Sequence, residues 1–272
     1  PFVREAYKNH FEFGLGFDMQ YSSDPSLNPQ KSFFKADFQF DLAGNLLSAF
    51  NNFMPVDSSG FHTIWNSPYS QFVRAELSLS YTWKFGKNNK QALAVRALGG
   101  AGYAYGNSTK MPFERLFWAG GSNSLRGWTA RSVGPGSSQM DQTFSIPNQT
   151  GDMRLEANVE YRFPLFSIFR GALFVDWGNV WNIDRTGRNH QSMEGSTEDE
   201  SAEQSSYFSF RNMLTTSALS WGAGIRLDLN FVVVRFDLGI KLYDPSVQQW
   251  QNARNWLRRG GYAFQFGIGY PF

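Results

Sequence analysis

Apolar and polar residues alternate strictly along several stretches of the chain. From Phe11 to Tyr21 the odd positions are aromatic or aliphatic, whereas the even positions are glycine or polar. The same alternation recurs over 34–42, 73–85 and 153–163. Because successive side chains of a β-strand point to opposite faces, each stretch predicts a strand with one apolar and one polar face.

Nine strands of this kind are predicted. They lie at about 11–21, 34–42, 73–85, 91–105, 153–163, 169–181, 217–229, 232–243 and 262–272. Soluble sheets most often use strands of about 5–6 residues, whereas a strand that crosses a membrane needs about 9–11. Several apolar faces also end in Tyr or Trp, as in an aromatic girdle at the lipid headgroups. Both features favour a transmembrane antiparallel β-barrel over a soluble β-sandwich.

The connections between these strands alternate in length. Short ones at 86–90, 164–168 and 229–232 alternate with long ones at 43–69, 106–152, 182–216 and 244–261. Transmembrane barrels have short periplasmic turns and longer exterior loops. We therefore assign the short connections to the periplasm and the long ones to the exterior.

Composition agrees with a barrel and excludes several other classes. Aromatic residues make up 17% of the chain, yet the mean hydropathy is only −0.40, and no run approaches the roughly 20 apolar residues of a membrane helix. A net charge of +2 is too small to indicate a nucleic-acid partner, and the absence of Cys excludes disulfides and thiolate metal sites. The chain begins without a signal peptide, so we expect a mature product or a chain whose beginning has been removed.

An odd number of strands is unexpected for a complete barrel. Bacterial single-chain barrels normally have an even count, and a sheet of nine would leave unpaired edges in lipid. The simplest prediction is that the chain is the C-terminal part of a larger barrel. A count wrong by one is the alternative.

Catalytic chemistry finds little support. His10, His62 and His190 have no metal-site spacing. Glu156 and Glu160 lie four residues apart on a strand, which separates their backbones by about 13 Å, beyond the roughly 5–9.5 Å of glycosidase carboxylates. We interpret these two carboxylates as a solvated lumen wall. The expectation is a non-enzymatic protein without metal or cofactor.

Three other segments have open interpretations. Gly99–Gly102 precedes no helix, so these glycines predict a bend or close packing rather than a phosphate loop. Acidic residues between Glu194 and Glu203 are expected to form a solvated loop more readily than a calcium site. The segment 244–258 looks helix-like and carries two Trp and two Arg, with a further Arg259 just beyond it. It could cap the barrel outside or contact a partner.

The long connection at 106–152 contains a segment, 113–136, that is too rich in apolar residues and glycine for a solvated loop. A loop that folds back into the lumen would have this composition. Within it, residues 119–128 read AGGSNSLRGW. This sequence resembles the G-G-x-x-S-(V/L)-R-G-(F/Y/W) signature of the BamA/TamA superfamily of outer-membrane assembly and translocation barrels.

Other motifs follow in the order expected for that superfamily. FVDWGNV at 174–180 resembles its F-x-D-x-G strand motif, and EYRFPL at 160–165 resembles a strand end of the family. The terminal Phe272 is similar to its aromatic C-terminal recognition signal. The sequence flanking the signature is most similar to the TamA-like lipoprotein branch of Bacteroidetes.

The resemblance implies a sixteen-stranded barrel preceded by periplasmic POTRA domains. The arginine-bearing loop would join the eleventh and twelfth strands of that barrel. Residues 1–272 would then hold strands eight to sixteen, and the first seven strands and the POTRA domains would be missing. An odd strand count is expected on this basis.

The resemblance also implies a set of site residues. The loop motif residues are Gly120, Gly121, Leu125, Arg126, Gly127 and Trp128. Their expected partners on strands are Phe174, Asp176, Gly178 and Glu160. Strand parity places Phe174 and Asp176 on the face of Arg170, which we assign to the lumen, so Arg126 could pair with Asp176 and stack on Phe174. We expect Gly127 to allow a tight turn beside the arginine. Alternatively, Arg126 is one of many lumen arginines.

The implied function is insertion or translocation of proteins at the outer membrane of a Gram-negative bacterium. A weak seam beside the last strand would template incoming strands. The outward residues of that strand are Tyr262, Phe264, Phe266, Tyr270 and Phe272. The expected partners are outer-membrane lipid, client proteins and accessory envelope proteins, but not nucleic acid. A two-partner-type secretion pore, a passive porin and an outer-membrane enzyme are the alternatives.

Overall fold

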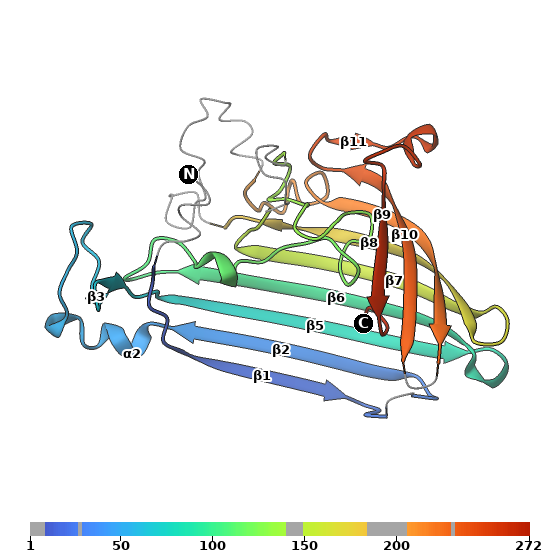
Figure 1. Ribbon diagram of the computed structural model, residues 1–272, viewed down its shortest axis with the longest axis horizontal. Coiled ribbons are helices and arrows are strands. Elements are labelled where there is room, and N and C mark those ends of the chain that lie inside the picture. The colour runs from blue at the N-terminus through green and yellow to red at the C-terminus, as the bar shows by residue number, and fades with distance from the viewer. Residues whose placement is uncertain (1–8, 27–28, 140–148, 184–205, 230–231) are drawn as a thin grey trace.

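The structure is a computed structural model that describes residues 9–26, 29–139, 149–183, 206–229 and 232–272. It is dominated by one large antiparallel sheet (Figure 1). Helical structure in these residues is limited to single turns: α2 (Asn45–Ser48), η1 (Asn51–Phe53), η2 (Lys87–Asn89), η3 (Phe113–Arg115) and η4 (Ala253–Asn255). No helix in the described ranges has the length and apolar character to cross a membrane.

All nine predicted strands are present. They are β1 (Gly14–Ser22), β2 (Phe33–Ala43), β5 (Phe72–Phe85), β6 (Gln91–Ala104), β7 (Met153–Pro164), β8 (Phe169–Trp181), β9 (Ala218–Asp228), β10 (Val233–Asp244) and β12 (Tyr262–Ile268). Each pairs antiparallel with its neighbour in chain order. Short extra strands occur in two exterior connections: β3 (Thr63–Ile64) pairs with β4 (Ser67–Pro68), and β11 (Gln249–Trp250) pairs with the end of β10.

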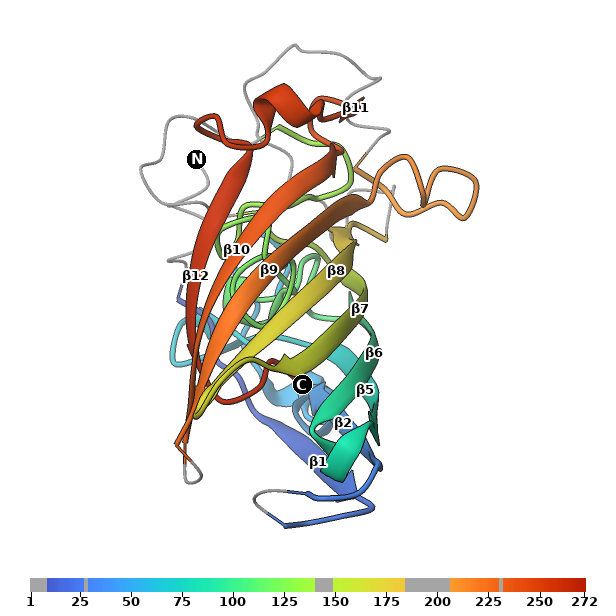
Figure 2. The same ribbon diagram turned by 90° about the vertical axis from the view of Figure 1, so that its right-hand side faces the viewer.

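The sheet curls around its own connecting loop. Figures 1 and 2 show β5 to β12 wrapping around the segment between β6 and β7, with β1 and β12 at the two margins of the sheet. Within the described residues β1 and β12 each pair with a single strand and not with one another. The architecture is a partial β-barrel, as expected.

The two faces of the sheet differ in polarity, with the apolar one outside. Outward positions such as Leu15, Val175 and Phe264 are exposed, whereas inward positions such as Arg226 and Asp237 are fully buried. A soluble sheet would bury its apolar face, because exposing it to water costs about 25 cal/mol per Å². This inverted pattern is the one that a lipid-facing surface requires.

The described part of the connection 106–152 packs against the inner face, as its composition predicts. Its apolar side chains form a small core with two strand residues; the members are Phe117, Ala119, Leu125, Trp128, Val133, Val180 and Ala218. Gly100 of β6 makes room for this loop, because a Cβ there would lie 2.6 Å from the ring of Phe117. The interpretation of Gly99–Gly102 as a site of close packing is therefore confirmed.

The last strand is shorter than predicted. β12 ends at Ile268, and Gly269 takes a positive φ of 82°. The chain then turns to the inside, where Arg162 lies 4.2 Å from the ring centroid of Tyr270 and Arg96 lies 5.2 Å from that of Phe272. The expectation that Tyr270 and Phe272 continue the outward aromatic face is wrong, since Gly269 bends the chain and two inward guanidinium groups hold the rings.

Two other boundaries differ from the predictions. The segment 244–258 is not a helix; it contains the two-residue strand β11 and the single turn η4. β1 begins at Gly14 rather than at residue 11, because Phe11 bridges instead to Tyr69 in the exterior connection after β2. Neither difference alters the sheet order.

Candidate functional site

Arg126 lies at the centre of the inner face and is only 1% exposed. Its Nε donates to Asp176 Oδ2 at 2.9 Å, and its Nη2 donates to Asp176 Oδ1 at 2.8 Å. The backbone N–H of Arg126 donates to the same carboxylate at 3.0 Å. A guanidinium is always charged and matches a carboxylate in two parallel bonds. Asp176 of β8 therefore fixes both the side chain and the backbone of the loop.

A second carboxylate and a ring complete the surroundings of Arg126. Glu160 of β7 accepts a hydrogen bond from Nη1 of Arg126, and Phe174 presents its ring 3.5 Å from Cζ of Arg126. The face of an aromatic ring attracts a cation, by about 2 kcal/mol or more where water is excluded. The expected partners Asp176, Phe174 and Glu160 thus all contact the loop arginine.

Further charges extend this arrangement across the inner face. Glu160 also accepts from Arg162 at 2.7 Å and from Arg226 at 3.0 Å. Arg226 in turn pairs with Asp237 of β10. Burying a lone charge is costly, and alternating signs offset that cost. The network joins the loop to β7, β8, β9 and β10.

The glycines of the loop motif have two different roles. Gly120 and Gly121 have positive φ values of 99° and 92°, which form the turn that precedes the arginine. Gly127 has no positive φ; instead, a Cβ there would lie 2.7 Å from Cβ of Ser220. The tight turn expected beside the arginine is present, since the N–H of Trp128 donates to the carbonyl of Leu125 at 3.1 Å across Arg126 and Gly127. Glycine is required at 127 because the position needs space beside β9. Gly178 likewise lies against the backbone of β7.

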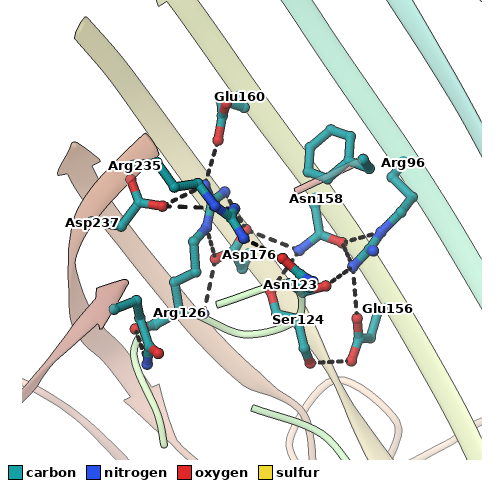
Figure 3. Close-up of polar contacts among 12 residues, drawn as sticks. Arg96, Asn123, Ser124, Arg126, Glu156, Asn158, Glu160, Asp176, Arg235 and Asp237 are labelled. Atoms are coloured by element: carbon teal, nitrogen blue, oxygen red, sulfur yellow. Dashed lines mark hydrogen bonds and ion pairs between the residues drawn. The ribbon is translucent and has the colours of Figure 1, made fainter. Parts of the chain in front are cut away.

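A separate polar cluster holds the tip of the loop (Figure 3). Ser124 donates to Glu156 of β7, while Arg96 of β6 pairs with the same carboxylate at 3.0 Å. Arg96 also donates to the backbone carbonyl of Asn123 at 2.8 Å. Glu156 and Glu160 are 2% and 0% exposed. Their interpretation as a solvated lumen wall is therefore wrong, since the loop covers both.

Asn158 connects the two groups of charges. Its amide donates to Asp176 at 2.9 Å and to the carbonyl of Ser124 at 3.0 Å, and its oxygen accepts from Arg96 at 2.7 Å. Figure 3 shows this side chain between Asp176 and Arg96. One neutral residue thus bridges the charges around Arg126 and those around Glu156.

The loop also contacts the terminal strand. Nε2 of Gln265 on β12 donates to the carbonyl of Trp128 at 2.8 Å and reaches that of Arg126 at 3.4 Å. Arg235 of β10 donates to the side chain of Asn123. The segment 123–128 is thus attached to strands from β6 to β12.

We expect Gln265→Leu to loosen β12 while leaving the Arg126 cluster in place. Leucine has a similar volume but leaves the two loop carbonyls without this donor, at a cost of about 1–3 kcal/mol. Hydrogen exchange should therefore rise along β12 and remain unchanged along β7 and β8. If hydrogen exchange along β12 is the same in Gln265→Leu as in the wild-type protein, Gln265 contributes nothing to the attachment. Phe264→Leu, a change on the outward face of the same strand, is the matched control.

Sequence reasoning missed Arg96, Asn158, Asp237 and Gln265. Strand parity places all four on the inner face, so their direction could be predicted. Their partners could not, because alternation says nothing about the path of a loop across the sheet.

The two described histidines, His10 and His62, lie apart from this site. Nε2 of His10 lies 2.9 Å from Glu114, and Glu12 is close enough for the three groups to approach a common ion. Glu12, however, already pairs with Arg115, and a guanidinium at that carboxylate competes with a cation. His62 lies in the exterior connection after β2 and is not part of this cluster. His190 and the acidic residues from Glu194 to Glu203 lie outside the described residues.

Known proteins share sequence similarity with this chain. A model of the Omp85 superfamily domain matches residues 4–272. The outer membrane protein assembly factor BamA of Neisseria meningitidis serogroup B is 26% identical over 133 residues, which are 47% of this chain and 16% of that protein. The chain therefore spans a small part of that relative's length.

Among solved structures, the crystal structure of BamA from Haemophilus ducreyi lacking POTRA domains 1–3 aligns with 98% of this chain and 55% of its own. The TM-score is 0.45 and the sequence identity 14%. The family match covers nearly the whole chain, and it confirms the resemblance seen in the loop and strand motifs. The chain belongs to the Omp85 superfamily, whose barrels are integral to the outer membrane of Gram-negative bacteria.

Proposed function

We propose that the chain is the part of an outer-membrane barrel that inserts or translocates other proteins without catalysing a covalent step. The observation that carries this proposal is the buried attachment of Arg126 to Asp176, Glu160 and Phe174. A loop bound across the inner face in this way links several strands into one unit. A passive channel gains nothing from such a link, whereas a barrel whose sheet must open in one place needs the remainder held together.

The margin at β12 is the candidate opening. Its second edge carries no strand in the described residues, and an unpaired edge can template an incoming strand. The strand is short and ends at Ile268, and the nearby Pro271 lacks an N–H donor. We propose that clients pair there, while Gln265 keeps the strand joined to the loop.

We extend the proposal to the remainder of the protein on the basis of the family resemblance. The chain would be strands eight to sixteen of a sixteen-stranded barrel, preceded by POTRA domains that recruit clients and accessory envelope proteins. Assignment to the TamA-like lipoprotein branch of Bacteroidetes stays a prediction.

Client insertion by the full-length protein in liposomes tests the proposal. A denatured outer-membrane barrel is added as client, and its folded, heat-modifiable form is followed over time. We expect Arg126→Lys to slow insertion severalfold, because lysine keeps the charge but cannot form the paired bonds to Asp176. Asp228→Asn, which alters an inner ion pair with Arg170 away from the loop, should insert the client at the normal rate.

Other outcomes would favour other functions. No acceleration by the wild-type protein, together with large stable conductance in planar bilayers, would overturn the proposal in favour of a porin. Export of a soluble passenger without any client insertion would favour a two-partner-type secretion pore.

A further inference from the structure

The connection between β10 and β12 combines tryptophan and arginine without any acid. Residues 245–261 include Trp250, Trp256 and Leu257 together with Arg254, Arg258 and Arg259, and they contain no Asp or Glu. The connection lies at the end of the sheet that carries the long loops, which we assign to the exterior. The inner-face network makes no use of these residues.

The structure places this connection on the outward side of the sheet. The ring of Trp256 meets that of Trp221 edge to face at 5.3 Å. Trp221 lies on β9 and shares its outward face with the exposed Ile225. The ring of Trp250 similarly lies 5.3 Å from that of Tyr243 near the end of β10. Trp250 and Trp256 therefore lie over the apolar surface, whereas Gln248 at the start of the connection points to the inner loop, where its Nε2 lies 3.4 Å from Oγ of Ser137.

Burial of one strand residue supports the same placement. Ile240 of β10 is an outward residue, since it pairs in register with Trp221 and Tyr262. It is nevertheless only 8% exposed, whereas Phe236 on the same face is 40% exposed. Trp256 of the connection packs against Trp221, the cross-strand neighbour of Ile240, which agrees with this low exposure.

The outer surface of the connection is left apolar and basic. Trp250 and Leu257 are 68% and 72% exposed, and the three arginines are exposed as well. None of these arginines pairs with an acid in the part of the chain that the structure describes. Tryptophan favours the boundary between hydrocarbon and water, and guanidinium groups bind phosphate in two parallel bonds.

We propose that residues 249–259 bind anionic lipid headgroups at the exterior surface of the membrane. Trp250, Trp256 and Leu257 would enter the headgroup boundary in continuity with the lipid-facing surface of β9 and β10. Arg254, Arg258 and Arg259 would hold phosphate groups there. Since β12 starts three residues after Arg259, these lipids would lie directly beside the terminal strand. This inference needs the membrane location but not the proposed insertion activity.

Site-directed spin labelling of the full-length protein tests this binding. The chain has no Cys, so a single Cys in place of the exposed Asn252 can carry a nitroxide. The protein is reconstituted in phosphatidylcholine alone or in phosphatidylcholine mixed with phosphatidylglycerol. We expect the label to be accessible to oxygen in both, and to be shielded from a water-soluble nickel chelate more strongly in the anionic vesicles.

Two matched triple variants separate charge from packing. One replaces Arg254, Arg258 and Arg259 with Gln, and the other replaces them with Lys. Each basic residue near an anionic surface contributes about fivefold to binding. The Gln variant should therefore lose the preference for spin-labelled phosphatidylglycerol over phosphatidylcholine by at least fivefold, whereas the Lys variant should retain most of it.

The opposite results would overturn the proposal. A nitroxide equally open to the nickel chelate in both vesicles would show that the segment stands in water. A nitroxide shielded from both reagents would show that protein covers it. Equal lipid preference in the wild-type and Gln proteins would show that the arginines bind no headgroups.

Discussion

Replacing Arg126 with alanine is expected to destabilise the barrel by about 3–5 kcal/mol and to release the loop from the inner face. The cost of removing one partner from a buried ion pair has this size because the other charges stay in place without it. Among the described residues, Asp176 would keep the amide of Asn158 and the backbone N–H of residue 126 as donors. Glu160 would still pair with Arg162 and Arg226. Asp176 would therefore be the buried carboxylate that loses its paired cation.

Two measurements follow this effect. The urea concentration at which the heat-modifiable form disappears reports barrel stability, and trypsin cleavage at Arg131 reports release of the loop. Arg126→Lys should fall between the wild-type and alanine proteins. In Arg126→Ala/Asp176→Ala the damage should be no greater than in the worse single variant, because each change removes the same contact. Unchanged stability in both single variants would make Arg126 a spectator.

The alternation of residue types predicts the sheet well, for a physical reason. Each strand has lipid on one side and polar groups on the other, so the constraint acts at every residue between about 72 and 85 of β5. The constraint ends where the chain leaves the sheet. At Gly269 the sequence still alternates, yet the backbone turns inward. Periodicity alone therefore extends the last strand too far.

The site could be predicted in part. A family motif and strand parity together predict the roles of Arg126, Phe174 and Asp176, because both point to the same face. Alternation places Glu156 on the correct face but does not predict its environment, since its burial depends on where Ser124 lies. The role of Gln265 cannot be predicted either, because its two acceptors are backbone carbonyls of the loop and no side-chain pattern reveals a carbonyl.

The contacts of the loop explain why its effects should reach the margin of the sheet. Its tip is bound to β6 through Arg96 and to β10 through Arg235, and its Trp128 carbonyl is bound to β12 through Gln265. A displacement of residues 123–128 would break bonds at both ends of this span together. The loop is thus the element that could transmit a displacement of the terminal strand to β6 and β7.

Glu156→Ala is expected to have the second largest effect, about 3–5 kcal/mol, because it leaves Arg96 and Arg154 without a shared carboxylate. Ser124 would lose its acceptor, so the loop tip should become accessible to protease. Glu156→Gln should be milder, since its amide oxygen can still accept from Ser124. Asp228→Asn, at a partly exposed ion pair, should cost less than about 1 kcal/mol.

Combining Glu156→Ala with Arg126→Ala then tests whether the two charge groups act as one. Asn158 contacts both, so loosening either group should already weaken its bonds to the other. We expect the double variant to be less destabilised than the sum of the single variants by about 0.5–3 kcal/mol, measured by the same urea titration. Strict additivity would mean that the Asn158 bridge has no energetic weight, and the loop would then be held by two independent attachments rather than by one cooperative network.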